Sequence, residues 1–342
     1  MNITFFIGNG FDLNLGLKTG YIDFYEWIRK KYESSNKEVT NIIYQQLFDD
    51  GANSYSNWAD LELAIGNYTG NVSIEDEKNF LDAKEELEQD LFEYLLSEVN
   101  CIDSNTARLA KEFRVATINF CREFNDIDRN SYKKLYENIT DNIIYRFVVF
   151  NYTDLIDKII IDLNIIAENN PEKNKDLFEK PIHIHGTLFN NMILGVNDKS
   201  QIKGSHSKEF EHYLIKRNLN SLLGTYNNQD VKKSIDASRY ICIFGMSFGE
   251  TDKIWWEYIV KWLQGDQNHR LVLFVYDKLN QNPSAQKKAR RIEYWKKFFI
   301  DRTDASNIVK DTIGNSIIVV LNSSIFNFQH ISLNREKGAK QQ

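Results

Sequence analysis

The chain has 342 residues, of which 42% are hydrophobic and 26% are charged, and its formal net charge at pH 7 is −6. This length and apolar content are enough to bury the core of one large or two modest domains. The negative charge excludes a basic protein built to wrap nucleic acid, so we do not expect nucleic acid as a partner, although a local basic patch stays open.

The cysteines and the N-terminal region both favour a cytoplasmic protein. Cys101, Cys121 and Cys242 are odd in number, widely spaced and form no C-x-x-C pair, as expected for reduced thiols in the cytosol. The first residues lack the basic and apolar regions of a signal peptide, and no apolar run approaches the roughly 18 residues of a membrane span. We therefore expect no membrane association.

The first part of the chain predicts one strand followed by a long helical block. Residues 2–7 are apolar and β-prone, which predicts a buried strand. From about residue 21 to 137 apolar residues recur at helical spacing, which is too long for one β–α connection. We predict a helical insertion or cap over 21–140, a core of residues 1–20 and 141–333, and a polar tail over 334–342.

The second part alternates strands and helices. Strands are expected at 146–150, 181–186, 192–195, 238–244, 271–276 and 316–321, and helices from 155, over 207–225, after 252 and over 284–299. Apolar strands alternating with helices predict an α/β fold, a Rossmann-like parallel sheet with helices on both faces. Polar, turn-rich segments follow four of the strands, at 8–12, 151–154, 185–186 and 245–252. Carboxyl ends of parallel strands share one edge, so these segments are expected to meet at one ligand crevice.

The first of these segments reads as a phosphate loop. Gly8 and Gly10 have no side chain, so their backbone N–H groups can approach a diphosphate closely. Leu13 stands where the dinucleotide fingerprint G-x-G-x-x-G has its third glycine, which weakens a dehydrogenase interpretation. A tight turn alone explains the glycines equally well. Asp12 is expected either to cap the next helix, or to bond a ribose or activate water.

His185 is the best catalytic candidate. It ends a predicted strand beside Gly186, which leaves room next to the ring, and a neutral imidazole can accept a proton near pH 7. The alternative is a structural histidine bonded to backbone. His183 shares its strand face, but no further ligands support a metal pair. Asn151 either makes a turn or holds a ribose hydroxyl or water.

Two further segments offer polar groups. Ser247 in G-x-S-x-G mimics a hydrolase nucleophile elbow, but the acid and histidine order after it does not fit, so we predict a phosphate or ribose loop. Asp252 is its polar partner or a helix cap. Glu62 reaches the crevice if its helix caps the sheet; otherwise it is a solvated carboxylate with Trp58 in the core.

Five short motifs in order resemble the AbiH family of bacterial phage abortive-infection proteins. They are residues 7–13 (IGNGFDL), 58–62 (WADLE), 150–154 (FNYTD), 184–186 (IHG) and 244–252 (FGMSFGETD). The resemblance implies defence against bacteriophage, in which the infected cell stops growing or dies before phage matures, and a phage-derived trigger.

AbiH proteins in turn resemble sirtuin-type domains that consume NAD, with which this chain shares a glycine turn, an Asn-Tyr pair and a His-Gly pair. The resemblance implies that Asn151 positions the nicotinamide ribose or water and that His185 is the general base. It assigns cofactor binding to Gly8, Asn9, Gly10, Asp12, Asn151, Tyr152, Gly186, Ser247 and Asp252. Asp12, which we add as a catalytic candidate, replaces the sirtuin serine. The four-cysteine zinc module is absent from the pattern, so we expect neither deacetylation nor a metal.

The sequence thus favours an enzyme that hydrolyses NAD+, its small-molecule nucleotide, at the nicotinamide N-glycosidic bond. One alternative is a metal-dependent nuclease or nucleotide hydrolase, with the ion held by Asp12, Glu62, Asp154 and Asp252. The other is a non-catalytic sensor of a nucleotide or a phage protein. The helical block is expected to cover the crevice until a phage component or homo-oligomerisation moves it.

Overall fold

A parallel sheet organises the molecule. The computed structural model describes residues 1–35, 38–53, 60–102, 106–168, 176–225, 227–279, 284–305 and 312–328. Within them the sheet strands are β1 (Asn2–Ile7), β2 (Ile143–Val149), β3 (Asp176–Phe178), β4 (Ile182–His183), β5 (Tyr240–Phe244), β6 (Arg270–Val275) and β7 (Ile317–Leu321). The order is β3-β2-β1-β5-β6-β7, with β4 also paired to β2, and every pairing is parallel.

The strand order reverses at β1. The chain adds β2 and β3 on one side of β1 and then returns to add β5, β6 and β7 on the other. This is the order of the dinucleotide-binding α/β fold, in which ligands bind at the carboxyl ends of the strands beside the reversal. The predicted Rossmann-like α/β fold is confirmed.

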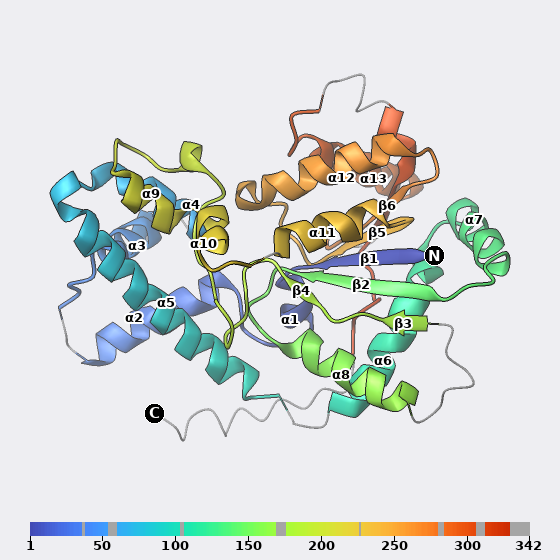
Figure 1. Cartoon of the computed structure of the whole chain (residues 1–342), viewed down its shortest axis with the longest axis horizontal. Helices are drawn as coiled ribbons and strands as arrows, with labels where there is room; N and C mark the ends of the chain where they lie inside the picture. The colour runs from blue at the N-terminus through green and yellow to red at the C-terminus, as the bar shows by residue number, and fades with distance from the viewer. Residues whose placement is uncertain are drawn as a thin grey trace.

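Helices cover both faces of the sheet (Figure 1). Successive side chains of a strand point to opposite faces, so Phe5 and Phe147 join one core and Phe6 and Val148 the other. The first face packs against α1 (Gly10–Asn14), α6 (Thr106–Ile118), α7 (Asp126–Glu137) and α8 (Leu155–Glu168). The second packs against α11 (Asn227–Asp236), α12 (Lys253–Gly265) and α13 (Ala285–Ile300).

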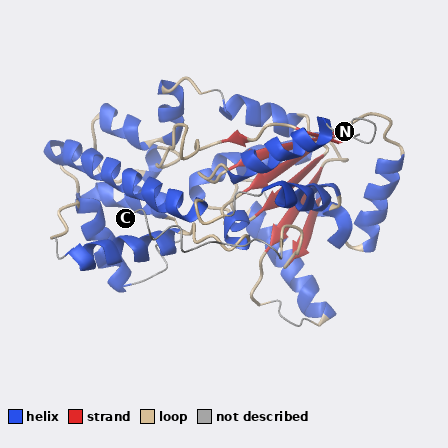
Figure 2. Cartoon of the chain, turned by 90° about the horizontal axis from the view of Figure 1, so that it is seen from below, coloured by secondary structure: helices blue, strands red, loops and turns tan. Residues whose placement is uncertain are grey.

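A separate helical lobe lies beyond the carboxyl ends of the strands (Figure 1), and Figure 2 shows helices without strands in this part. We define the lobe as α2 (Tyr21–Ser35), α3 (Ile42–Asn53), α4 (Leu61–Tyr68), α5 (Glu77–Val99) and α9 (Lys208–Leu214). Its own apolar core includes Tyr44, Phe80 and Phe210. Figure 1 shows α10 (Lys216–Leu222) between the lobe and the sheet. The lobe therefore stands over the edge where ligand sites are expected.

The strands differ from the predicted pattern at three places, and the first is β3 (Asp176–Phe178), which no predicted strand covers. Residues 192–195 form no strand; their chain is irregular, and Val196 makes only a single bridge to Ile215. The strand predicted at 181–186 is confined to β4, so His185 lies in the loop that follows it.

Within the predicted insertion 21–140, α6 and α7 pack in the core of the sheet, whereas α2 to α5 pack in the lobe. The domain division itself stays a prediction. The predicted tail 334–342 and Trp58 lie outside the described residues. No helix in the described ranges is both long and apolar enough to cross a bilayer.

Candidate functional site

The glycine loop after β1 packs against the loop after β5. The N–H groups of Gly8 and Gly10 donate to the carbonyls of Phe244 and Gly245, both at 2.9 Å. A Cβ on Gly10 would lie 2.5 Å from Gly245 Cα, and Gly245 itself has φ +69°. The glycines therefore let two backbones meet at the strand-order reversal. Diphosphate binding at this loop stays a prediction. A diphosphate that accepted hydrogen bonds from these two N–H groups would have to replace the carbonyls of Phe244 and Gly245 as their acceptors.

Asp12 lies in a buried polar cluster under this loop. Its Oδ2 accepts a hydrogen bond from Thr153 Oγ1 at 2.7 Å, and the side chain does not cap α1, whose N-cap is Asn9. Burial raises the pKa of Asp12 to about 6, although Thr153 and Asn151 lower it. Neither amide atom of Asn151 makes a hydrogen bond of standard geometry within the described residues. Asp12 and Asn151 are thus neighbours, as predicted for segments that follow parallel strands of one sheet.

His183 belongs to the structural part of this cluster. Its Nδ1 faces the carbonyl of Asn151 at 3.2 Å, and its Nε2 faces Asp157 Oδ2 at 2.6 Å. Asn227 donates to the carbonyl of His183 at 2.6 Å. Both ring nitrogens are engaged, so His183 ties β2, α8 and α11 together.

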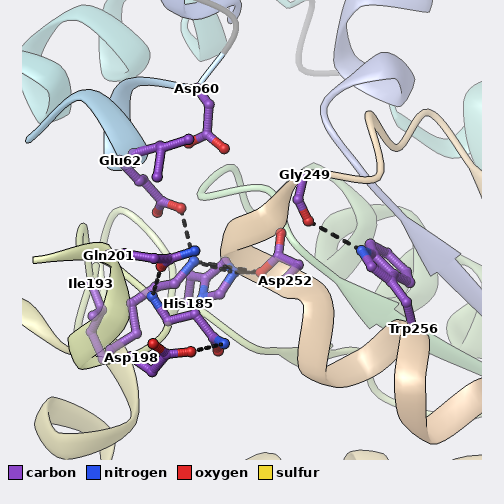
Figure 3. A network of polar contacts seen from close by, with 12 residues as sticks. Asp60, Glu62, His185, Ile193, Asp198, Gln201, Gly249, Asp252 and Trp256 are labelled. Atoms are coloured by element: carbon purple, nitrogen blue, oxygen red, sulfur yellow. Dashed lines mark hydrogen bonds and ion pairs between the residues drawn. The ribbon is translucent and has the colours of Figure 1, made fainter. Parts of the chain in front are cut away.

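A second buried cluster includes Glu62, His185 and Asp252, which Figure 3 labels, and Lys216 lies among them. Its Nζ lies 2.8 Å from Glu62 Oε2, 3.4 Å from His185 Nε2 and 3.5 Å from Asp252 Oδ1. His185 Nε2 lies 3.1 Å from Asp252 Oδ1. Glu62 comes from α4 of the lobe, and Asp252 ends the short helix η7 (Glu250–Asp252) after β5. The helical lobe and the sheet therefore build this Lys216 cluster together.

The neighbouring charges shift the pKa values of two of its groups, Asp252 and Lys216. Burial alone would raise the pKa of Asp252, but Lys216 and His185 lower it to about 2. Burial disfavours the charged form of Lys216, but Asp252 and Glu62 raise its pKa above the ordinary value. An ionised Asp252 only accepts, so a proton on His185 Nε2 satisfies this contact, the shorter of the two that Nε2 makes; the Lys216 ammonium at 3.4 Å can only donate. In a neutral ring the lone pair then lies on Nδ1, which has no partner among the described residues.

A small cavity of about 100 Å³ adjoins this cluster at the carboxyl edge of the sheet. Four predicted site residues line it, namely Tyr152, His185, Ser247 and Asp252. The lobe contributes Tyr21 of α2, Glu62 of α4, and Asp60, the N-cap residue of α4. Burial, with Glu62 nearby, raises the pKa of Asp60 to about 6. The cavity thus combines an ionised carboxylate, an imidazole and a carboxyl group that titrates near neutral pH.

The other predicted residues lie outside this lining. They are Gly8, Asn9, Gly10, Asp12, Asn151 and Gly186. The side chain of Asn9 bonds Thr19, and a Cβ on Gly186, which has φ +72°, would lie 1.9 Å from the carbonyl oxygen of Asn191. Asn9 and Gly186 have local structural partners, and their proposed ligand roles stay predictions.

Lys216 and Asp60 are the functional candidates that sequence reasoning did not single out. Lys216 is one of 42 basic residues and stands in a short polar helix, so no local pattern marks it as buried. Asp60 reads as a helix cap, and it does accept from Leu63 N at 3.0 Å. Glu62 was expected in the crevice only if its helix caps the sheet, and it is 5% exposed in the cluster.

The four carboxylates of the metal-dependent alternative do not form one set. Asp12 and Asp154 lie near each other, and Glu62 and Asp252 flank Lys216. Among the described residues, no three or more His, Cys, Asp or Glu side chains are arranged to hold a metal ion. No observation therefore favours that alternative.

Comparison with known proteins adds one finding. The family model described as bacteriophage abortive infection AbiH matches residues 4–274, more than half of the chain. The matched range includes the glycine loop, the helical lobe and both polar clusters. No curated protein matches the chain.

Proposed function

Because this chain belongs to the AbiH family of bacteriophage abortive-infection proteins, we propose that it acts in infected cells by hydrolysing NAD+ at the nicotinamide N-glycosidic bond. The family supports the abortive-infection role. The reaction is our proposal, and the cavity beside the Lys216 cluster is its proposed site.

One observation carries the proposal. His185 lines a cavity at the carboxyl edge, its Nε2 lies 3.1 Å from Asp252 Oδ1, and its Nδ1 is buried without a partner among the described residues, which makes Nδ1 the proposed basic atom. A carboxylate that fixes an imidazole in one tautomer is the arrangement of a general base. The strand order, which puts ligands at this edge, supports a nucleotide substrate.

The reaction needs few groups. The N-glycosidic bond breaks through an oxocarbenium-like state, and nicotinamide leaves with the bonding electron pair, which neutralises its ring nitrogen. Water adds to the ribose carbon, and His185 accepts its proton, giving ADP-ribose. The negative charge of Asp252 would stabilise the positive ribose. Asp60, with a pKa of about 6, can exchange protons with the product hydroxyl or solvent near neutral pH.

Lys216 has a positioning role in this scheme. Its ammonium group pairs with Glu62, which is 5% exposed, and its charge helps to lower the pKa of the buried Asp252 to about 2. It therefore fixes Asp252, and through it the ring of His185.

The test follows NAD+ in cells that express the protein, with and without phage. We expect NAD+ to collapse after infection with the wild-type chain and not with His185→Ala, because loss of a general base lowers a rate by roughly 10²–10⁴-fold. Asn151→Ala tests the role implied by the sirtuin resemblance. Purified chains are assayed in parallel for nicotinamide release.

His269→Asn is the matched control. His269 precedes β6 at the opposite edge of the sheet, where its Nδ1 lies 2.6 Å from the carbonyl of Trp262. It should behave as wild type. Steady NAD+ during effective defence would reject the glycohydrolase. Defence that survives in His185→Ala cells would instead reject His185 as the base and favour a sensor.

A further inference from the structure

We propose that a second cavity, on the other side of His185 and Asp252, binds the diphosphate of a nucleoside diphosphate. Its volume is about 490 Å³, and α10, α11 and the start of α12 contribute to its walls. In NAD+ the occupant would be the ADP half, and that identification alone rests on the proposed function.

The two cavities are neighbours that share three lining residues. His185, Thr251 and Asp252 line both of them. The smaller one, of about 100 Å³, falls below the ~300–1,000 Å³ of ordinary ligand pockets, whereas the larger lies within that range. A ligand that spans both would have its middle at His185. With nicotinamide in the smaller cavity and the ADP half in the larger one, the nicotinamide ribose, which carries the reacting bond, would lie beside His185.

The larger cavity has two cations outside any close ion pair, although Arg217, after the hydrogen bonds from Ser200 and Asn197, helps to lower the pKa of Asp198. Arg217 on α10 and Lys232 on α11 line it, and neither makes a salt bridge within the part of the chain described. Within the described residues, Lys232 Nζ lies over the ring of Tyr258, 5.5 Å from its centroid. Both side chains are free to turn toward an anion.

The carboxylates of this cavity are already engaged. Asp304 and Glu257 face Lys253 Nζ at 2.7 and 3.7 Å, and Asp252 faces Lys216. Asp198 caps the turn that follows it by accepting from Ser200 N at 2.8 Å. Formal positive and negative charges of the lining are equal in number, and Arg217 and Lys232 are the two cations that make no salt bridge within the described residues, so they are the groups that can pair with a diphosphate.

Neutral donors complete the site. Asn220 is 5% exposed and lines the cavity; its Oδ1 accepts from Thr225 at 2.8 Å, and its amide nitrogen donates to no atom of the described residues. The first turn of α12 opens on the same cavity, and no side chain caps it. The Lys253 N–H already donates to the carbonyl of Glu250 in η7, so the contribution expected from this helix start is its dipole, which favours phosphate oxygens. In the glycine loop, by contrast, the N–H groups of Gly8 and Gly10 are already bonded.

The first measurement is calorimetric titration of the full chain with ADP, and with adenosine as the probe that lacks phosphate. We expect ADP to bind, and Arg217→Ala and Lys232→Ala each to weaken it about tenfold, the scale of one charged hydrogen bond. Adenosine affinity should not change. Lys233→Ala is the matched control, because Lys233 is the next residue of α11, is exposed and pairs with Asp230. Absence of ADP binding, or equal losses in Lys232→Ala and Lys233→Ala, would overturn the inference.

The second measurement separates this inference from the proposed reaction. If NAD+ is hydrolysed, Lys232→Ala should raise KM for NAD+ about tenfold with kcat unchanged, and should leave hydrolysis of nicotinamide riboside unaffected. Hydrolysis with an unaltered KM would reject the diphosphate site and leave the reaction standing. ADP binding that depends on Lys232 in a chain without hydrolysis would support the site and reject the reaction.

Discussion

At the scale of single residues, Lys216 is the most constrained charge in the molecule's candidate site. It is 4% exposed and lies between Glu62 and Asp252. A buried ion pair adds little net stability over an apolar pair, but removing one partner leaves the other charge buried and uncompensated. We therefore expect Lys216 to matter less for net stability than for the positions of Glu62 and Asp252.

We expect Lys216→Met to lower the free energy of unfolding by roughly 3–5 kcal/mol. Adding Glu62→Gln should recover part of that loss, because it removes a buried carboxylate that no longer has a cation beside it. Urea unfolding followed by tryptophan fluorescence measures both. Lys233→Ala, on the surface of α11, should change stability by less than about 0.5 kcal/mol. A loss in Lys216→Met as small as this control would mean that the cluster is solvated.

At the scale of elements, the glycine loop and the loop after β5 form one backbone-to-backbone joint. Gly8 and Gly10 face Gly245 and Met246 at distances that no Cβ can occupy. Phe244 and Gly245 accept the N–H groups of the glycine loop. The same glycine spacing that suggests a phosphate loop thus also satisfies a packing requirement between β1 and β5.

Gly10→Ala is expected to destabilise the protein by about 3 kcal/mol, because both neighbours of the new Cβ are backbone atoms that cannot turn aside. Gly265→Ala is the control: nothing lies within 4 Å of a Cβ there, and the position ends α12. It should be neutral or slightly stabilising. Thermal unfolding distinguishes the two. Should Gly10→Ala keep full stability and lose nucleotide binding, the loop would be a ligand site after all.

At the scale of the whole molecule, the site exists only where the lobe meets the sheet. Glu62 and Lys216 are 154 residues apart, and His185 and Asp252 are 67 apart. The Lys216 cluster therefore couples the position of α4 and α10 to the geometry of His185. The proposed gating of the crevice by the lobe stays a prediction, and this coupling is the contact through which it would act.

The buried carboxylates also set how stability varies with pH. The pKa of Asp12 is raised from 3.8 to about 6, so its contribution is complete below pH 3.8 and is lost as pH rises through 6. Asp60 acts in the same direction. Asp252, with a pKa of about 2, contributes above pH 3.8 and loses its contribution as pH falls through 2. These three groups together favour the fold most near pH 4.

We therefore expect the free energy of unfolding contributed by Asp12 to fall by on the order of 3 kcal/mol between pH 4 and 7. Asp12→Asn should flatten this slope, since the amide does not ionise. Asp126→Asn, an exposed side chain on α7, should retain it. Urea titrations at several pH values give the slopes, and equal slopes in the two variants would contradict a buried, protonated Asp12.

The sequence by itself determined the α/β class, most of the strands and helices, and the edge at which the polar segments meet; the short β3 and the irregular chain at 192–195 were not predicted. The periodicity of apolar residues is a local property, so the residues at 2–7 and 238–244 are enough to predict strands there. Their carboxyl ends then meet because parallel strands share an edge, which brought Tyr152, His185, Ser247 and Asp252 to one cavity. Only the tertiary structure decided that Lys216 and Asp60 join them, that α6 and α7 pack on the sheet, and that the glycine loop donates to β5. These depend on contacts between segments far apart in the chain, and whether a lysine is buried or solvated is set by what docks over it.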